Sequence, residues 1–203
     1  MGTRQRRDQE AKRRRQSILD AARDVFFKHG YAAATIPKVA AAAELAPGTL
    51  YLYFPSKDAL YAELLAEGYE TLHQRLAAGV QPGAAPRRQA EAMIDAFFQF
   101  ARENPEYFDI VFFVLQREGA KREGRLDAAQ IQRLKALERR SQTVAAQVLR
   151  RAGSGNARRD QATLDALWSM LAGVIFYFSN DPSFDVVAAQ AKRLLLSAIF
   201  PGD

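Results

Sequence analysis

The sequence predicts an all-α fold of nine helices, and three observations support this. Apolar residues recur at intervals of three or four along nearly every segment, whereas strand-like alternation and internal repeats are absent from the sequence. Glycine, asparagine and proline stand between these segments, where helices begin or end. With 203 residues, 48% of them hydrophobic, the chain is long enough to bury a sizeable core.

The first two helices are predicted from their ends as well as from their apolar spacing. Residues 16–29 place apolar side chains on one stripe, and Gly30 follows as a helix-ending residue. Thr35 is a suitable N-cap for a short helix over 35–43. Pro37 lies in its first turn, where the missing N–H costs nothing.

The third and fourth helices follow closely. Pro47 stands at a first helical position and opens a helix over 47–53, which Pro55 ends. Ser56 then caps a longer fourth helix whose leucines recur at helical spacing. The glycine- and proline-rich stretch 79–86 is the clearest loop in the chain.

Five more helices are predicted beyond this loop. One of them is apolar on nearly every side and should be buried all round. Asn-Pro and Gly-Ser-Gly-Asn clusters separate several of them. The five helices are predicted over 87–103, 107–115, 126–151, 160–179 and 184–199.

The net charge of +6 is concentrated near the N-terminus. Residues 1–60 hold 11 Lys or Arg and 6 Asp or Glu, whereas residues 61–203 hold 18 and 17. A basic N-terminal region on a near-neutral body indicates a polyanionic partner for that region alone. Residues 1–13 are predicted to form a basic disordered arm, and the alternative is a solvated tail that has no partner.

The composition argues against several classes of function. No cysteine is present, which excludes disulfides, thiolate metal sites and a cysteine nucleophile. With two histidines, no metal-binding spacing, no catalytic triad and no phosphate-binding glycine loop, the sequence predicts no enzyme, cofactor or metal site. No run approaches 18 uncharged apolar residues and no secretory signal is seen, so we expect a cytoplasmic protein without a membrane span.

The second and third predicted helices, joined by a turn of three or four residues, have the arrangement of a helix-turn-helix. The second helix of such a unit enters the major groove of DNA, so Thr49 and Tyr51 should reach base edges or nearby phosphates. Tyr53 and Lys57 should reach the DNA backbone. The predicted DNA contacts are Arg13, Arg14, Thr35, Pro47, Gly48, Thr49, Tyr51, Leu52, Tyr53 and Lys57.

Residues 14–62 resemble the DNA-binding head of the TetR family of transcriptional repressors. The family's usual run is a glycine followed by Thr-Leu-Tyr-x-Tyr-Phe-x-x-Lys-x-x-Leu, and this run is matched from Gly48 to Leu60. The rest of the chain is similar to the family in length and all-helical pattern. Upstream matches are Ile18, Ala21, Ala22, Phe26, Gly30, Thr35, Ile36, Val39 and Ala40.

Three residues depart from the family's pattern. Ala46 stands in place of a common capping serine, Pro47 in place of a polar or basic residue, and Leu52 in place of His, Trp or Asn. The DNA surface therefore offers fewer hydrogen-bond donors than usual. Pro47 and Leu52 are instead suited to thymine methyl groups, which predicts a half-site that contains A/T pairs.

The body of the chain is rich in aromatic residues. The resemblance implies a ligand cavity and a dimerisation surface there. Independently, the rings in residues 93–115 and 167–178 exceed what a small bundle needs, which favours a lipophilic cavity, although for each single ring a plain core is the alternative. The predicted cavity residues are Phe97, Phe100, Tyr107, Phe108, Phe112, Gln116, Trp168, Leu171 and Tyr177.

The last two predicted helices are apolar across more than one stripe, which is more than packing inside one subunit requires. A four-helix bundle with the same pair of helices from a second subunit would cover the excess. A two-fold dimer also suits a palindromic DNA site. The predicted interface residues are Leu164, Leu167, Ile175, Ala191, Leu194 and Leu195.

Together these features predict a ligand-responsive dimeric repressor. It should bind a palindromic double-stranded DNA operator and be released by a small hydrophobic effector. The predicted division is an arm over 1–13, a helix-turn-helix domain over 14–60 and a ligand-binding and dimerisation domain over 61–203. The alternatives are a transcriptional activator, a ligand-independent DNA-binding regulator or, from another class, a helical small-molecule-binding protein with a weak DNA head.

Overall fold

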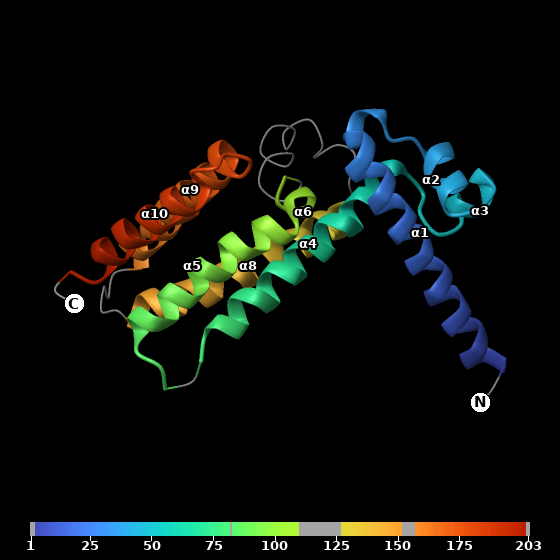
Figure 1. Cartoon of the computed structure of the whole chain (residues 1–203). Coiled ribbons are helices and arrows are strands. Elements are labelled where there is room, and N and C mark those ends of the chain that lie inside the picture. The colour runs from blue at the N-terminus through green and yellow to red at the C-terminus, as the bar shows by residue number, and fades with distance from the viewer. Residues whose placement is uncertain (1–2, 82, 110–126, 152–156, 202–203) are drawn as a thin grey trace.

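The computed structural model describes residues 3–81, 83–109, 127–151 and 157–201. Within these ranges the regular elements are nine helices, and the predicted all-α fold with an N-terminal helix-turn-helix head and a helical C-terminal domain is confirmed. Figure 1 shows a small head, formed by α1, α2 and α3, at one end of a longer helical body. Helix α4 leads from the head into the body (Figure 1).

The head begins with α1, which covers Thr3–Ala33 and breaks sharply at Gly30. The φ angle of 70° at this residue lies in a region that glycine adopts more readily than other residues do. Helix α2 covers Ile36–Ala42, and Thr35 caps it as predicted, because its side chain accepts a backbone hydrogen bond from the first turn. Helix α3 covers Pro47–Tyr51 and ends two residues earlier than predicted.

The N-terminal arm differs from its prediction. Residues 1–13 were expected to be disordered, whereas α1 is helical from Thr3 onward. The physical reason is composition, because residues 4–16 contain no glycine, proline or β-branched residue. Acidic residues also precede basic ones by four positions at Asp8–Lys12 and Glu10–Arg14, a spacing that stabilises helices.

The body consists of six described helices. They are α4 Lys57–Gly79, α5 Pro86–Glu103, α6 Pro105–Asp109, α8 Ala128–Arg151, α9 Ala157–Phe178 and α10 Phe184–Ile199. Helices α4 and α8 run side by side in the same direction. Arg133 pairs with Glu63 and Arg140 with Glu70, so both pairs join residues 70 positions apart. Helices α9 and α10 pack against each other and against α5 (Figure 1).

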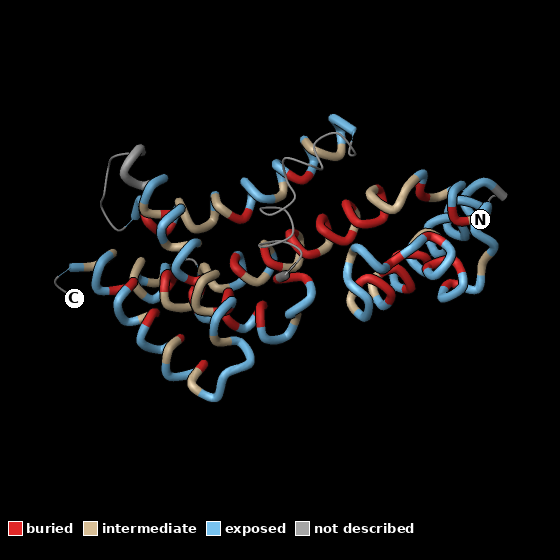
Figure 2. The backbone as a smooth tube through the Cα atoms, turned by 90° about the horizontal axis from the view of Figure 1, so that it is seen from above, coloured by how far each residue is buried: buried red, intermediate tan, exposed pale blue. Residues whose placement is uncertain are grey.

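Two hydrophobic cores meet along α4. The head core contains residues of α1, α2 and α3, the first half of α4 as far as Tyr69, and Leu134 of α8. Along α4 the body core begins at Leu72, and it joins α4 to α5, α6, α8, α9 and α10. The domain boundary predicted at residue 60 therefore falls inside a helix that belongs to both cores. Figure 2 shows the buried residues gathered where the helices face one another.

Helix α9 presents an apolar surface that the other described residues leave uncovered. By length and composition alone, Gln161–Phe178 is apolar enough to cross a membrane, with a mean hydropathy of 1.2, and it is the one such helix in the described ranges. Only 17% of the residues in this segment are buried. Met170, Phe176 and Tyr177 all lie exposed on it. An apolar surface of this kind indicates a contact with another surface.

Candidate nucleic-acid interface and ligand cavity

The outer face of the head is defined by which residues of α3 point inward. Leu50 is completely buried in the head core, and Phe54, directly after the helix, is buried beside it. With Leu50 fixed inward, the two side chains that follow it, at the end of α3 and directly after it, face outward. Tyr51 is 51% exposed and Leu52 is 83% exposed. A phenol and an isobutyl group thus project from the head side by side.

The other predicted DNA contacts divide into exposed and packed residues. Thr35, Pro47 and Gly48 are exposed, and so are Arg13 and Arg14 on the N-terminal part of α1. In contrast, Thr49 is half-buried, and Tyr53 packs partly against the head core. The exposed residues therefore lie on α1 and at the starts of α2 and α3, whereas the phenol ring of Tyr53 is partly taken up by packing.

Lys57 lies differently from the prediction. Its ammonium donates hydrogen bonds to the carbonyl oxygens of Tyr31 at 2.9 Å and Ala34 at 3.1 Å, and it lies 4.1 Å from the centre of the Tyr31 ring. The neighbouring Asp58 accepts a hydrogen bond from the Tyr31 hydroxyl. These contacts hold the chain that follows the Gly30 break against the start of α4. The Lys57 ammonium was predicted to bind a phosphate. Two of its N–H groups instead donate hydrogen bonds within the head.

A partly open apolar cavity lies in the body, away from the head. Its volume is about 60 Å³, and the side chains that line it are apolar apart from the Trp168 indole. Phe97 and Trp168 both line it and contact each other, with ring centres 5.0 Å apart. Within the described ranges, no group of three or more His, Cys, Asp or Glu is placed to hold a metal ion. The lining residues are Leu76, Ala90, Met93, Ile94, Phe97, Ala145, Val148, Leu149, Leu164, Leu167, Trp168, Leu171 and Ile199.

Only part of the predicted cavity set lines this space. Phe97, Trp168 and Leu171 line the cavity. Phe100, Tyr107 and Phe108 are instead buried in the packed core between α4, α5 and α6, and Tyr177 is 75% exposed on α9. Phe112 and Gln116 lie outside the described residues. The aromatic spacing did not separate rings that line a cavity from rings that fill a core, and it did not point to the lining residues of α4, α8 and α10.

The predicted dimer residues also require correction. Ile175, Ala191 and Leu195 are buried within the subunit, and Leu164 and Leu167 line the cavity. Among the six predicted residues, Leu194 is exposed, at 53%. The stripes of α9 and α10 that face inward and outward are both apolar, so the sequence pattern did not distinguish them. The large apolar side chains exposed on these two helices are Met170, Phe176, Tyr177, Val186 and Leu194.

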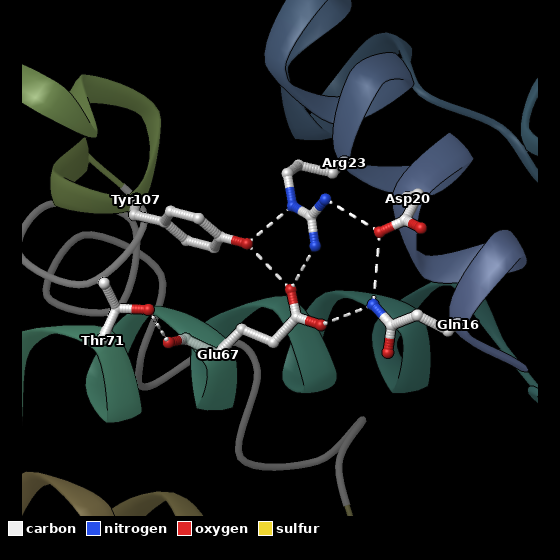
Figure 3. A network of polar contacts seen from close by, with 6 residues as sticks. All are labelled: Gln16, Asp20, Arg23, Glu67, Thr71 and Tyr107. Carbon is white, nitrogen blue, oxygen red and sulfur yellow. Dashed lines mark hydrogen bonds and ion pairs between the residues drawn. The ribbon is translucent and has the colours of Figure 1, made fainter. Parts of the chain in front are cut away.

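A polar network joins the head to the body. Arg23 of α1 donates from Nε to the Tyr107 hydroxyl at 2.7 Å and from Nη2 to Glu67 at 2.7 Å. The Tyr107 hydroxyl donates to Glu67 at 2.8 Å, so three helices meet at one carboxylate (Figure 3). Asp20 and Gln16 extend the network along α1. A displacement of α6 therefore changes its hydrogen bonds to both α1 and α4.

Neither Arg23 nor Glu67 was predicted from the sequence. The signal available was weak, because each is a charged residue directly beside a buried alanine of an amphipathic helix. Such residues usually lie at the edge of a core without any special role. Only the packing of α1 against α4 and α6 brings their charges together.

Replacing Tyr107 with phenylalanine tests this network. Burial, together with the hydrogen bond to Glu67, raises the pKa of Tyr107 from 10 to about 12. A raised pKa means that the neutral phenol stabilises the folded state fully below pH 10 and that this contribution is lost as the pH rises toward 12. Tyr107→Phe should lower the free energy of unfolding by about 1–2 kcal/mol at pH 7.

The difference between the wild type and Tyr107→Phe should then shrink between pH 10 and pH 12. Urea unfolding followed by circular dichroism at intervals across this range measures it. Burial and the nearby Glu138 also raise the pKa of Tyr69, but that effect is common to both proteins and cancels in the comparison. A difference that stays constant up to pH 12 would show that the Tyr107 hydroxyl is not held as described.

Two family patterns match the chain. Residues 18–64 match the pattern described as bacterial regulatory proteins, tetR family. Residues 90–196 match the tetracyclin repressor-like, C-terminal domain pattern. The two matches cover the head with the first part of α4, and most of the body.

Individual relatives agree with these patterns. The transcriptional repressor KstR of Mycolicibacterium smegmatis is 35% identical over 92 residues, so the chain spans about half the length of that relative. The transcriptional repressor NicS of Pseudomonas putida is 25% identical over 200 residues, or 95% of this chain and 92% of NicS. Among solved structures, FadR from Bacillus subtilis in complex with stearoyl-CoA has a TM-score of 0.71 at 16% identity, covering 90% of this chain and 97% of FadR.

Proposed function

The chain belongs to the tetR family of bacterial regulatory proteins, DNA-binding transcriptional regulators and not enzymes, and we propose that it is a dimeric repressor released from its operator by a lipophilic effector. The observation that carries the proposal is the outer face of α3. Leu52 is 83% exposed there beside Tyr51, on a head that holds nearly all of the net positive charge. Large apolar side chains exposed on a basic surface are suited to the grooves of DNA.

Within this proposal several of the predicted DNA contacts have roles that their positions support. Tyr51 and Leu52 reach into the major groove, with Leu52 against thymine methyl groups. Thr35 and the exposed N-terminal end of α3 contact phosphates and set the register. Lys57 contributes mainly by holding the end of α1 against α4, as its hydrogen bonds to Tyr31 and Ala34 support.

The proposed dimer uses the outward faces of α9 and α10. Met170, Phe176, Tyr177, Val186 and Leu194 supply a surface that a second copy covers by two-fold symmetry. The two heads of such a dimer read half-sites about one helical turn apart. The names of KstR and NicS, both repressors, support repression as the outcome of binding.

The proposed effector site is the apolar cavity. At about 60 Å³ it is far smaller than the roughly 300–1,000 Å³ of typical ligand pockets, so an effector must widen it by moving the helices around it. The movement is transmitted along α4, whose Leu76 lines the cavity and whose Glu67 belongs to the network with Arg23 and Tyr107. A ligand that prefers the widened state shifts the population away from the state that binds DNA.

Binding experiments test the proposed function directly. Palindromic duplexes selected from a random pool should bind in a salt-sensitive, sequence-selective manner, as measured by fluorescence anisotropy. Stearoyl-CoA, the ligand in the FadR structure, serves as a first lipophilic probe and should weaken operator binding. Operator DNA must weaken binding of the probe by the same factor. Absence of any selective duplex would contradict the proposal, and selective binding that no lipophilic probe changes would favour a ligand-independent regulator.

The cavity can be probed through Trp168, the single tryptophan of the chain, which lines it. Binding of a lipophilic probe should change its fluorescence. Ala145→Leu places a larger side chain in the cavity wall and should weaken probe binding at least about tenfold, because extra methylene groups leave less space and overpack the core. Ala136→Leu, on the exposed side of the same helix, is the matched control. Equal probe affinity in both variants would place the effector elsewhere.

A further inference from the structure

The N-terminal part of α1 projects from the head as a free-standing helix. Every residue from Arg4 to Arg14 is exposed. Arg15 anchors this extension at its base, because its guanidinium pairs with Glu63 at 2.9 Å and lies 4.6 Å from the centre of the Phe54 ring. In Figure 1 the extension leaves the head on the side where α2 and α3 lie and points away from the body. This helix does not contribute to the head core, so packing does not explain its presence.

The charge of the extension is its second informative property. Seven basic residues stand against two acidic ones, Asp8 and Glu10, between positions 4 and 15. The first turn of α1 contains no acidic residue. Cations near a helix N-terminus oppose the helix dipole and reduce helix stability. The chain therefore keeps a charge distribution that disfavours its own helix, which indicates a polyanionic partner. The basic residues are Arg4, Arg6, Arg7, Lys12, Arg13, Arg14 and Arg15.

The helical state restricts how DNA can be bound. An α-helix with its side chains is about 10–12 Å wide, whereas the minor groove is about 6 Å wide. A disordered arm can enter that groove, but an intact helix cannot. The extension from Arg4 to Arg15 spans roughly 16 Å, at 1.5 Å per residue. This length corresponds to about five base pairs of duplex along one strand.

We propose that the N-terminal extension of α1 is a second DNA contact that stays helical and binds backbone phosphates flanking the operator half-site. This inference rests on the proposed operator binding of the head. The extension adds affinity that depends on salt and not on base sequence. It also lengthens the protected DNA by about five base pairs on each outer side of the palindrome.

Two matched sets of variants separate charge from helical structure. Arg6→Gln, Arg7→Gln and Arg13→Gln combined remove charge but keep good helix formers. Gln9→Pro keeps every charge but breaks the helix in the middle of the extension, and Gln9→Ala is its control. Arg139→Gln, exposed on α8, controls for the loss of charge elsewhere. Circular dichroism of full-length proteins checks that Gln9→Pro loses helix relative to Gln9→Ala.

The triple variant should bind the operator about 10- to 100-fold more weakly near 100 mM salt, with a salt slope reduced by about 0.9 for each lost phosphate contact. Gln9→Pro should lose a similar amount of affinity, whereas Gln9→Ala and Arg139→Gln should match the wild type. Trimming five base pairs from each flank of the duplex should reduce the affinity of the wild type at least to that of the triple variant.

Three results would overturn this inference. Wild-type affinity and slope in the triple variant would show that the extension does not touch DNA. Wild-type affinity in Gln9→Pro would show that it binds as an unstructured chain. Competition by distamycin for the flanking base pairs would place it in the minor groove. If instead the full-length wild type binds no duplex selectively, the proposed function fails first, so the two failures are distinguishable.

Discussion

Replacing Tyr177 with arginine should convert the protein into a monomer of 22.6 kDa and weaken operator binding at least about a thousandfold. Tyr177 is 75% exposed on α9 and packs edge-on against Phe176, with ring centres 4.9 Å apart. In a two-fold interface each substitution occurs twice, so two apolar contacts are lost and two like charges are introduced. A monomer engages one half-site and loses the gain in effective concentration that links the two heads.

Size-exclusion chromatography with light scattering gives the mass, and anisotropy with the selected palindrome gives the affinity. Gln132→Arg, an equal charge change on the exposed side of α8, should leave both unchanged. The thermal midpoint of Tyr177→Arg, measured in the monomeric range of concentration, should stay close to that of the wild type, because the ring is largely outside the subunit core. A dimeric Tyr177→Arg variant with normal affinity would move the interface away from α9.

Replacing Tyr51 with alanine should weaken operator binding by about 30- to 1,000-fold in the dimer, because each half-site loses about 1–2 kcal/mol. The phenol is 51% exposed on α3, beside Leu52. Removing it leaves the buried Leu50 and Phe54 in place, so the thermal midpoint should change little.

Tyr51→Phe divides this effect between the hydroxyl and the ring. Loss of most of the affinity in Tyr51→Phe would assign it to a hydrogen bond, whereas retention would assign it to ring contacts with the groove. Non-specific DNA should bind all three proteins nearly equally, since phosphate contacts from the basic residues are unchanged. If the Tyr51→Ala variant keeps both its operator affinity and a normal thermal midpoint, α3 is not the helix that contacts the bases.

Local signals predicted the helical elements well because the interactions that define helix ends lie within a few residues. Thr35 and Ser56 cap α2 and α4, and Pro47 opens α3, as their side chains alone indicate. The prediction that residues 1–13 are disordered was wrong, and the reason is again local. The absence of glycine, proline and β-branched residues from positions 4–16 allows α1 to continue through these residues.

The candidate sites were predicted less completely because they depend on contacts between distant residues. Lys57 lies in the predicted motif, but its partners Tyr31 and Ala34 come from the segment that directly follows the Gly30 break. Tyr107 was predicted to line a cavity, and it instead joins Arg23 and Glu67. These partners are 23 to 84 positions apart in the chain.

The sequence by itself determined that this protein is all-helical and that its N-terminal residues carry a helix-turn-helix on a basic head. Periodicity, caps and breaking residues act within one or two helical turns, and net charge does not depend on folding. Only the tertiary structure decided which apolar stripe of α9 and α10 is covered by their own subunit and which rings enclose the cavity. It also decided that Lys57 turns inward and that Arg23 and Tyr107 meet at Glu67. These outcomes depend on how helices with several similar apolar faces rotate against one another, and that rotation is set by packing between segments far apart in the chain.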